Sequence, residues 1–411
     1  MYKDSKTFHN YPFLHKKCQK KRMSPQVQNE GQKAYWKYEF LFVPLFNYKN
    51  KHQTMNRHTY CIIMAGGIGS RFWPMSRQNR PKQFLDMLGT GKSFIRHTFE
   101  RFAALIPTEN FLVVTNERYR EMVLEHLPEL SSEQVLGEPI GRNTAPCIAY
   151  AAYSLLKRDP EARMVVTPSD HLILNEEAFR TIITQCLDFT TNHRALMTVG
   201  IRPTRPETGY GYIQISDDEE ITKVKSFTEK PNIELAQTFI RCGEFFWNSG
   251  IFIWKVSDIV EALEAHQPET AALFRSIMPT LGTPEEAEAI RRVYGECRPI
   301  SIDYGVMEKA DNAYVRCGDF GWSDVGTWGS IYQNARKDRY ANAKPSEGCY
   351  VYNTRSSIIS LPKGKVAVID GLKEYIVVDT DDVLLICPRA NEQHIKKYID
   401  EVKYNTGEEF I

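Results

Sequence analysis

Short apolar runs alternate with stretches of helical spacing along the chain from residue 59 onward. The apolar runs predict strands at residues 61–64, 111–115, 134–136, 164–167 and 195–201. The stretches between them predict amphipathic helices at residues 93–101, 118–127 and 144–157. Such alternation is typical of right-handed β-α-β units. We therefore expect an α/β fold with a Rossmann-like mixed, mostly parallel sheet flanked by helices.

The pattern changes near residue 348. Evenly spaced short β-type runs follow, at residues 349–353, 357–361, 366–369, 375–378 and 383–386, and helical spacing covers residues 391–404. We expect an α/β domain at residues 55–338 and a small C-terminal β-rich domain at residues 346–411 that ends in a helix.

The first 54 residues differ from the rest in charge, and their hydrophobic residues show no regular spacing. They hold eleven Lys and Arg against three Asp and Glu, which leaves 41 basic and 48 acidic residues for the remainder. A polar, basic segment of this kind is expected to be mostly disordered. We hypothesise that the segment is an over-called gene start, with Met55 as the first residue. The competing idea is a basic arm for nucleic acid or an anionic surface, but nothing in the segment matches a binding module. The mildly acidic remainder has no general attraction to nucleic acid.

Composition is that of an ordinary globular protein, with 42% hydrophobic and 25% charged residues. No apolar run approaches the roughly 18 residues that span a bilayer, so no membrane partner is expected. The nine cysteines are odd in number and form no C-x-x-C pair. This usage favours a reducing compartment and argues against structural zinc. We expect a cytoplasmic protein.

A glycine loop follows the first predicted strand. Ligands bind at the carboxyl ends of strands in open α/β sheets, and the residues at this end are Ala65, Gly66, Gly67 and Gly69. Because they lack bulky side chains, a phosphate chain can approach their backbone N–H groups. The cations Arg71 and Lys82 follow, and a triphosphate needs such charges for neutralisation.

Two better-known glycine loops do not fit. A dinucleotide-binding G-x-G-x-x-G that starts at Gly67 would have Phe72 in its sixth place. The run that ends in Gly91, Lys92 and Ser93 has the end of a P-loop. However, Asp86 stands where the first P-loop glycine belongs, so we interpret this run as a turn before a helix.

The run from Gly66 to Phe84 has the pattern G-G-x-G-x-R-x-W-P-x-S-R-x-x-x-P-K-Q-F. It resembles the signature of the sugar-1-phosphate nucleotidylyltransferases, and within them the mannose-1-phosphate guanylyltransferase branch. The resemblance implies Mg²⁺-dependent transfer of GMP from GTP to α-D-mannose 1-phosphate, with GDP-mannose and pyrophosphate as products. It also implies a left-handed β-helix-like C-terminal segment and a homodimer. The alternatives are a relative with another sugar or base specificity and a non-catalytic regulatory homologue.

The nucleotide-binding residues implied by the resemblance come from the glycine loop and from a later segment, E-P-I-G-R-N-T-A-P, at residues 138–146. They are Ala65, Gly66, Gly67, Gly69, Ser70, Glu138, Arg142 and Asn143. A carboxylate suits the guanine N1–H and exocyclic amine, which makes Glu138 the candidate base contact. Without the resemblance, this segment is a polar turn in which Asn143 or Thr144 caps a helix.

Two aspartates are candidate metal ligands. Asp170 ends a predicted strand in the motif P-S-D-H, and Asp324 lies in G-W-S-D-V-G-T-W. On residue type alone, each would be a helix cap. The family motifs instead imply that both bind one Mg²⁺, a cation that proteins hold through one or two carboxylates and substrate phosphates.

The remaining expected site residues bind the sugar phosphate or neutralise charge. Segments around residues 209–213 and 227–231 match the family's G-Y-G-Y-I and F-x-E-K-P motifs, although a Glu-Lys pair at a strand end is commonly only a surface pair. The resemblance implies sugar-phosphate contacts from Gly209, Tyr210, Glu229, Asn248 and Asp303. It implies catalytic roles in charge neutralisation for Arg71, Lys82 and Lys230.

Overall fold

The computed structural model describes residues 56–217, 219–344 and 347–411. These residues belong to one compact unit that spans Lys49–Ile411. The basic segment at residues 1–54, for which we weighed disorder against an over-called start, lies outside the described residues. None of the described helices is long and apolar enough to cross a membrane.

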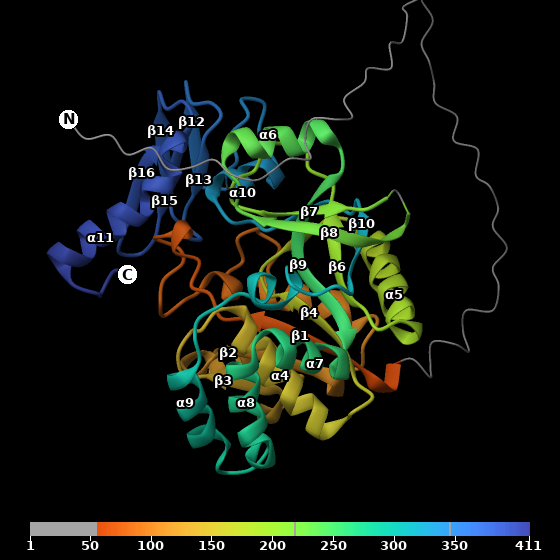
Figure 1. The fold of residues 1–411 in the computed structure, drawn as a ribbon. Helices are drawn as coiled ribbons and strands as arrows, with labels where there is room; N and C mark the ends of the chain where they lie inside the picture. Colours follow the sequence, from red (N-terminus) through yellow and green to blue (C-terminus); the bar gives the residue numbers. More distant parts are fainter. Residues whose placement is uncertain (1–55, 218, 345–346) are drawn as a thin grey trace, which may run out of the picture. The chain divides into compact units, whose positions relative to one another are not determined.

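A nine-stranded sheet forms the centre of the unit (Figure 1). Its strands, in spatial order, are β3 (Val135–Glu138), β2 (Phe111–Asn116), β1 (Thr59–Ala65), β4 (Arg163–Pro168), β9 (Phe245–Lys255), β6 (Leu196–Ile201), β10 (Ala313–Gly318), β8 (Ile221–Glu229) and β7 (Gly211–Ile215). The five strands predicted in the first half of the chain are all present. The mixed α/β sheet expected from the sequence is therefore confirmed.

The prediction that the sheet is mostly parallel is wrong, because four of its strand pairings are parallel and five are antiparallel. Strands β3, β2, β1 and β4 run parallel to one another, and β6 runs parallel to β10. The other five pairings, which involve β9, β8 and β7, are antiparallel. The aromatic strand β9 is inserted between β4 and β6, and it reverses the direction there.

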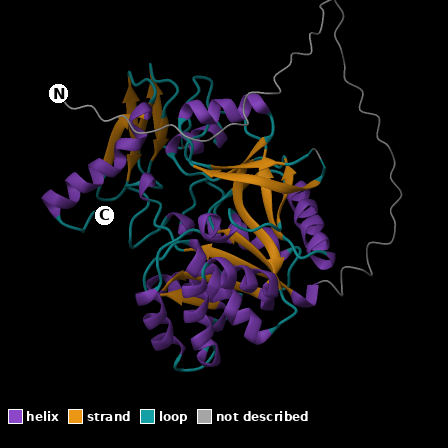
Figure 2. Ribbon diagram, viewed as in Figure 1, coloured by secondary structure: helices purple, strands orange, loops and turns teal. Residues whose placement is uncertain are grey.

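Helices cover both faces of the sheet, as Figure 2 shows. Side chains alternate along β1, so that Ile62 packs into one hydrophobic cluster while Cys61 and Ile63 pack into another on the opposite face. The helices on the Ile62 face are α4 (Thr144–Arg158), α7 (Val256–His266), α8 (Pro268–Ile277) and α9 (Glu286–Glu296). Those packed in the other cluster are α2 (Phe94–Ala103), α3 (Arg120–His126), α5 (Glu176–Asn192) and α6 (Ile233–Cys242).

The C-terminal residues form short strands, as expected. Alternate strands pair in parallel: β12 (Cys349–Tyr352) with β14 (Ala367–Asp370), and β13 (Ile358–Ser360) with β15 (Tyr375–Asp379). Strand β16 (Leu384–Pro388) pairs antiparallel with β15, and α11 (Ile395–Thr406) follows. Pairing of alternate strands is that of stacked coils. The left-handed form of such a coil stays a prediction, as does the domain boundary near residue 346.

Helix α11 packs against the segment that follows the glycine loop. Phe72 and Trp73 share a hydrophobic cluster with Ile395 and Ile399 of α11. The Trp73 indole Nε1 donates a hydrogen bond of 2.7 Å to the Phe410 carbonyl. The same cluster contains Trp328 of the short helix α10 (Trp328–Asn334). The end of the chain is thereby fixed beside the loop predicted to bind phosphate.

Candidate active site

A cleft of about 330 Å³ opens at the carboxyl ends of β1 and β4. These strands are adjacent and parallel, with Met64 in register with Pro168, so the loops that leave them start side by side. The cleft is lined by Gly69, Ser70, Arg71, Phe72, Lys82, Asp170, His171, Asp324, Gly326 and Lys396. Six of the residues expected to bind nucleotide or metal, or to neutralise charge, thus line one cavity, namely Gly69, Ser70, Arg71, Lys82, Asp170 and Asp324.

Lys82 lies at the wall of the cleft and is only 3% exposed. Its ammonium group donates to Asp170 Oδ2 at 2.7 Å and to the backbone oxygen of Asp324 at 2.9 Å. The rings of Phe72 and Phe94 lie 5.4 Å and 5.2 Å from the same nitrogen. Lys82 therefore connects the two segments that carry the expected metal ligands, and aromatic faces stabilise its charge.

Gly69 fits against Lys82 because it has no side chain. Its φ of 78° lies in the left-handed region, which glycine adopts without steric cost. A Cβ at this position would come 2.5 Å from the Lys82 Cβ. The backbone of the loop and the buried lysine are consequently packed directly against each other.

Asp170 and Asp324 both face the cleft, and neither caps a helix. Helix α5 is capped by Asn175 and α10 by Thr327, which lie beyond the two aspartates. Burial alone would raise the pKa of the Asp170 carboxyl, but the charge of Lys82 and its hydrogen bond to the carboxylate hold that pKa below its ordinary value. Asp170 is therefore an ionised carboxylate, the form that a cation binds.

Tyr210 lies beside the second aspartate. Its hydroxyl donates a hydrogen bond of 2.6 Å to Asp324 Oδ1, and the Gly326 backbone N–H donates to the same oxygen at 3.0 Å. The Tyr210 ring packs edge-on against Trp247 and Trp322. The sugar-phosphate contact that the sequence predicted for Tyr210 stays a prediction, and in the structure the Tyr210 hydroxyl orients Asp324. Gly209 is exposed and donates its N–H to Glu207.

The donor set suits a magnesium ion held partly by substrate. Within the described ranges, no group of three or more His, Cys, Asp and Glu side chains is arranged to hold a metal. Two carboxylates are enough for Mg²⁺ when phosphate oxygens complete its shell. The hydrogen bonds of Lys82 and Tyr210 use Oδ2 of Asp170 and Oδ1 of Asp324. Each carboxylate has further lone pairs with which it can bind a cation.

His171 follows Asp170 in the cleft wall. Its Nδ1 accepts a hydrogen bond of 3.2 Å from the Trp322 indole, which requires the neutral imidazole. Burial lowers the pKa of His171, against the opposing influence of Asp170 and Asp324. A neutral His171 adds no charge beside the two carboxylates.

Glu138 lies behind the glycine loop at the end of β3. It is 5% exposed, and a Cβ on Gly66 would come 3.3 Å from its Oε2, so the two residues are neighbours. Burial raises the pKa of Glu138 to about 7, although a hydrogen bond of 3.0 Å from the Tyr294 hydroxyl partly offsets the shift. A buried acceptor of this kind is suited to selecting among bases.

The residues after Glu138 form the start of helix α4. Asn143 has a φ of 67° and its side chain accepts from the Thr144 N–H, so it caps the helix as the simpler alternative predicted. Arg142 donates from Nε to the Tyr294 carbonyl at 2.9 Å. Arg142 and Glu138 are thus both positioned by Tyr294, whose importance no sequence motif indicated.

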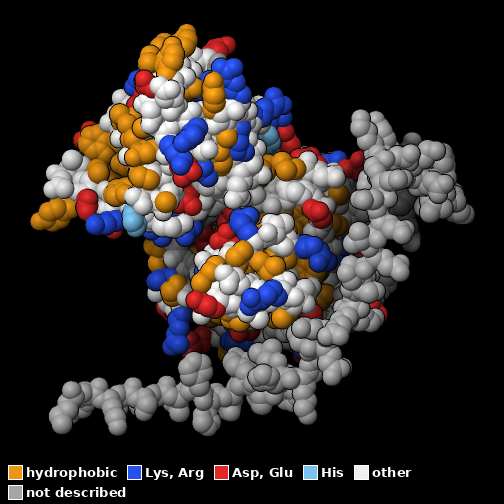
Figure 3. Space-filling model, turned by 90° about the horizontal axis from the view of Figure 1, so that it is seen from above, with side chains coloured by type: hydrophobic (Ala, Val, Ile, Leu, Met, Phe, Trp, Pro, Cys, Tyr) orange, Lys and Arg blue, Asp and Glu red, His pale blue; other side chains and the backbone are white. Residues whose placement is uncertain are grey.

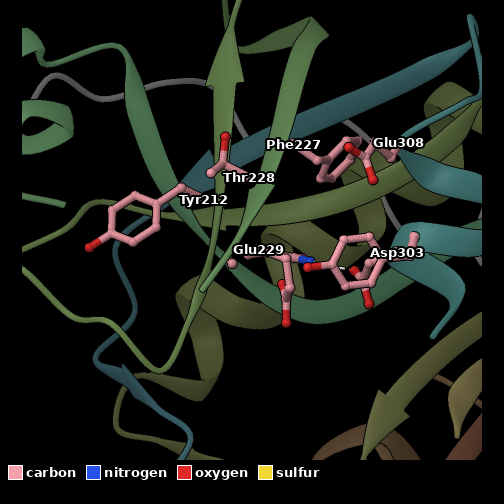
Figure 4. Close-up of a pocket in the computed structure, with 9 residues that line it drawn as sticks. Tyr212, Phe227, Thr228, Glu229, Asp303 and Glu308 are labelled. Carbon is pink, nitrogen blue, oxygen red and sulfur yellow. Dashed lines mark hydrogen bonds between the residues drawn. The ribbon is translucent and has the colours of Figure 1, made fainter. Parts of the chain in front are cut away.

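A second, smaller pocket brings together three of the expected sugar-phosphate contacts (Figure 4). Asn248 donates to Asp303 Oδ1 at 2.6 Å, and Glu229 lines the same pocket. Burial, and then the charge of Glu229, raise the pKa of Asp303 to about 6. Lys230 pairs with Glu229 at 2.6 Å but is exposed, and its φ of 46° directs the backbone out of β8. Polar groups that could bind sugar hydroxyls therefore converge here.

Comparison with known proteins identifies the family of the chain. A family model described as nucleotidyl transferase matches residues 60–340. The chain belongs to the nucleotidyl transferase family. The resemblance seen in the glycine-loop signature is thereby confirmed. As a member of this family, the protein is an enzyme.

Relatives of this nucleotidyl transferase share most of its length. It is 36% identical over 357 residues to the mannose-1-phosphate guanylyltransferase ManC of Salmonella typhimurium, covering 84% of this chain and 73% of that protein. It is 35% identical over 357 residues to a mannose-1-phosphate guanylyltransferase of Klebsiella pneumoniae, covering 85% and 75%. A solved structure from Thermus thermophilus, described as a mannose-1-phosphate geranyltransferase, is similar with a TM-score of 0.76 and 30% identity, covering 84% of this chain and 99% of that one.

Three residues at the site of this nucleotidyl transferase were not predicted from its sequence. His171 stood inside the P-S-D-H motif, so the motif itself was the available signal. Tyr294 and Lys396 lie in ordinary amphipathic helices outside the motifs, and only the fold brings them to the site.

Proposed function

We propose that this nucleotidyl transferase transfers GMP from GTP to α-D-mannose 1-phosphate, giving GDP-mannose and pyrophosphate. The observation that carries the proposal is the single cleft that joins the glycine loop, Lys82, Asp170 and Asp324. The relatives named mannose-1-phosphate guanylyltransferase, at about 35% identity over most of the chain, support the choice of base and sugar.

In this proposal, the glycine loop binds the triphosphate through its backbone N–H groups, and Arg71 and Lys82 offset its negative charge. Glu138, once ionised, accepts hydrogen bonds from the guanine N1–H and exocyclic amine. The protein contributes positioning and preorganised charge, since the mannose 1-phosphate oxygen is itself the nucleophile at the α-phosphorus. No covalent intermediate with the protein is needed.

The sugar phosphate is held from the other pocket. Glu229, Asn248 and Asp303 accept from or donate to mannose hydroxyls, and Lys230 pairs with the phosphate in place of its present partner Glu229. Asp170 and Asp324 hold the divalent cation, proposed as Mg²⁺. When bound, this ion supplies positive charge to the phosphate oxygens during in-line displacement.

The proposal is tested by assaying the purified protein for pyrophosphate release. GTP, ATP, UTP and dTTP are each paired with mannose 1-phosphate, glucose 1-phosphate and related hexose phosphates, with Mg²⁺ present. The expected result is turnover with GTP and mannose 1-phosphate at the highest kcat/KM. Preference for another pair would assign a different specificity, and no turnover with any pair would support the regulatory alternative.

We also propose a homodimer that uses the C-terminal strands. Exposed apolar side chains form a row on the paired strands β12 and β14. They are Tyr350 and Tyr352 of β12, Val368 of β14 and Val366 directly before β14, and each is more than half exposed. Figure 3 shows hydrophobic side chains gathered toward the side of the molecule on which Figure 1 places these strands. A left-handed coil in this segment would present the row as a flat face. Sedimentation of the purified protein tests the dimer, and a monomer at micromolar concentration would contradict it.

A cytoplasmic location remains part of the proposal. The cysteines in the described part of the chain are all free thiols, which is compatible with a reducing compartment.

A further inference from the structure

We infer that Lys396 of the C-terminal helix binds the β- and γ-phosphates of the nucleoside triphosphate, the part that leaves as pyrophosphate. The inference rests on the proposed function and extends it to a residue outside every sequence motif. Lys396 lines the same cleft as Gly69, Ser70 and Arg71. Helix α11 therefore supplies a cation to the loop that holds phosphate.

The position of Lys396 is fixed because residues before and after it in the sequence are packed into the protein. Its neighbour Ile395 is fully buried, and Ile399, one turn later, is 9% exposed in the cluster that contains Phe72 and Trp73. Beyond the helix, the Trp73 indole binds the Phe410 carbonyl. Because Phe72 and Trp73 directly follow Arg71, the packing that orders α11 also orders the phosphate loop.

A second anchor joins the C-terminal residues to the same loop segment. The Arg77 guanidinium makes two hydrogen bonds of 2.6 Å to the Asp382 carboxylate, with its side chain largely buried. Bidentate pairing of this kind fixes orientation as well as distance. The approach of α11 to the loop is thus held at two separate points.

The positive charge of Lys396, unpaired within the described residues, also indicates that it binds an anionic ligand. Lys82 is already paired with Asp170, so much of its charge is balanced within the protein. In the part of the chain that the structure describes, Lys396 and Arg71 make no hydrogen bond or ion pair, and both side chains are exposed at the cleft. A triphosphate keeps net negative charge after one divalent cation has bound, and these two cations can balance it.

The location within the cleft favours the leaving phosphates over the α-phosphate. Lys396 lies with the loop residues 69–71, whereas the sugar pocket is lined by Glu229, Asn248 and Asp303 and does not include it. The α-phosphorus must lie between the sugar phosphate and the leaving group for in-line attack. Lys396 lines the cleft of the glycine loop and not the sugar pocket, and on this ground we assign it to the pyrophosphate.

The neighbouring Lys397 provides a matched control. It is one residue away on the same helix, is also exposed, and pairs with Glu401 at 3.7 Å instead of lining the cleft. Lys396→Gln and Lys397→Gln remove the same charge from the molecule as a whole. Only Lys396→Gln removes it from the cleft, so a difference between the variants reports local binding and not net charge.

The test measures the binding of three ligands by calorimetry to the full-length wild-type and variant proteins. GTP and pyrophosphate contain the leaving phosphates, and GDP-mannose lacks them while sharing the guanosine and α-phosphate. For Lys396→Gln we expect about 10-fold weaker binding of GTP and of pyrophosphate, with GDP-mannose affinity and melting temperature unchanged. Lys397→Gln should bind all three ligands like the wild type, and Lys396→Arg should restore most of the affinity.

Equal losses for GTP and GDP-mannose in Lys396→Gln would overturn the assignment to the leaving phosphates. Unchanged GTP binding would overturn any role for Lys396 in the site. If the wild-type protein itself bound neither GTP nor GDP-mannose, the proposed function would fail first. The two failures are therefore distinguishable in one set of titrations.

Discussion

The Lys82 ammonium lies 2.7 Å from the Asp170 carboxylate, although 88 residues separate them in sequence. The same nitrogen also binds the Asp324 carbonyl, so one buried cation joins the glycine-loop segment to both aspartate segments. The cleft is thus organised by Lys82 before any ligand binds. A charge fixed in advance lowers the reorganisation that a reaction requires.

Replacing Lys82 with methionine should reduce both turnover and stability. The variant keeps an apolar chain between Phe72 and Phe94 but leaves Asp170 without its cation. We expect kcat to fall by about 10²–10³, the effect of removing one preorganised charge. Steady-state assays together with thermal melting check the two effects. Near-normal turnover in Lys82→Met would show that Lys82 has no role in the chemistry.

Replacing Tyr210 with phenylalanine should weaken metal binding selectively. The change removes the 2.6 Å hydrogen bond to Asp324 and leaves the ring packed against Trp247 and Trp322. Loss of a hydrogen bond that orients a metal ligand costs about 10-fold or more in metal affinity. The concentration of Mg²⁺ at half-maximal rate should rise accordingly, while GTP binding measured without metal stays the same. A higher KM for mannose 1-phosphate at unchanged Mg²⁺ dependence would instead favour the sugar contact predicted from the sequence.

The affinity for GTP should depend on pH through Glu138. Burial raises the pKa of Glu138 to about 7, and only the ionised carboxyl accepts two hydrogen bonds from guanine. GTP binding should therefore strengthen as pH rises through about 7 and level off above it. The hydrogen bond from the Tyr294 hydroxyl lowers the pKa of Glu138. Its loss in Tyr294→Phe should therefore move the midpoint of the pH dependence of GTP binding to higher pH. Glu138→Gln controls for the titration of GTP itself and should lack this component.

The raised pKa of Glu138 also makes the free energy of unfolding depend on pH, in the opposite direction from the affinity for GTP. The folded protein keeps a proton that an exposed glutamate releases near its ordinary pKa of 4.5. The contribution of Glu138 to the free energy of unfolding should consequently fall as pH rises from 4.5 to about 7. Denaturant titrations of the wild type and Glu138→Gln across this range measure it. A contribution that rose with pH would contradict a raised pKa.

Alanine at Gly69 should be more damaging than alanine at Gly89. Both glycines have positive φ, 78° and 68°, so both variants carry a backbone cost of about 1 kcal/mol. Only at Gly69 would the added Cβ meet another atom, the Lys82 Cβ at 2.5 Å, whereas none lies within 4 Å at Gly89. The melting temperature should drop further in Gly69→Ala, and turnover should fall in that variant alone. Equal effects would show that Gly69 and Lys82 are not tightly packed.

Sequence reasoning located the centre of the fold because its signals were local. The apolar run of residues 61–64 became the buried strand β1, and the glycines after it became the loop at the sheet edge. The motif around Asp170 likewise led to the cleft. Residues whose role depends on a neighbouring element were harder to place. The sugar-phosphate contact expected of Tyr210 stays a prediction. Its hydrogen bond to Asp324 could not be predicted, because the approach of Asp324 depends on how β7 and β11 (Trp322–Ser323) are positioned.

The sheet order could not be derived from the hydrophobic pattern. Strand β9 is buried and aromatic, and its pattern fits a parallel or an antiparallel neighbour equally well. The direction follows only from its place between β4 and β6. Lys396 shows the same limitation, since an exposed lysine on a terminal helix gains meaning only from the packing of Ile395 and Ile399 on Phe72 and Trp73.

A crystal of the protein with GDP-mannose and Mn²⁺ as an anomalous substitute for Mg²⁺ tests the central claim most directly. The account predicts one anomalous peak within ligand distance of the Asp170 and Asp324 carboxylates and of a phosphate oxygen, with guanine beside Glu138 and mannose beside Asp303. A metal peak away from the two aspartates, or a nucleotide sugar bound in another cavity, would contradict it.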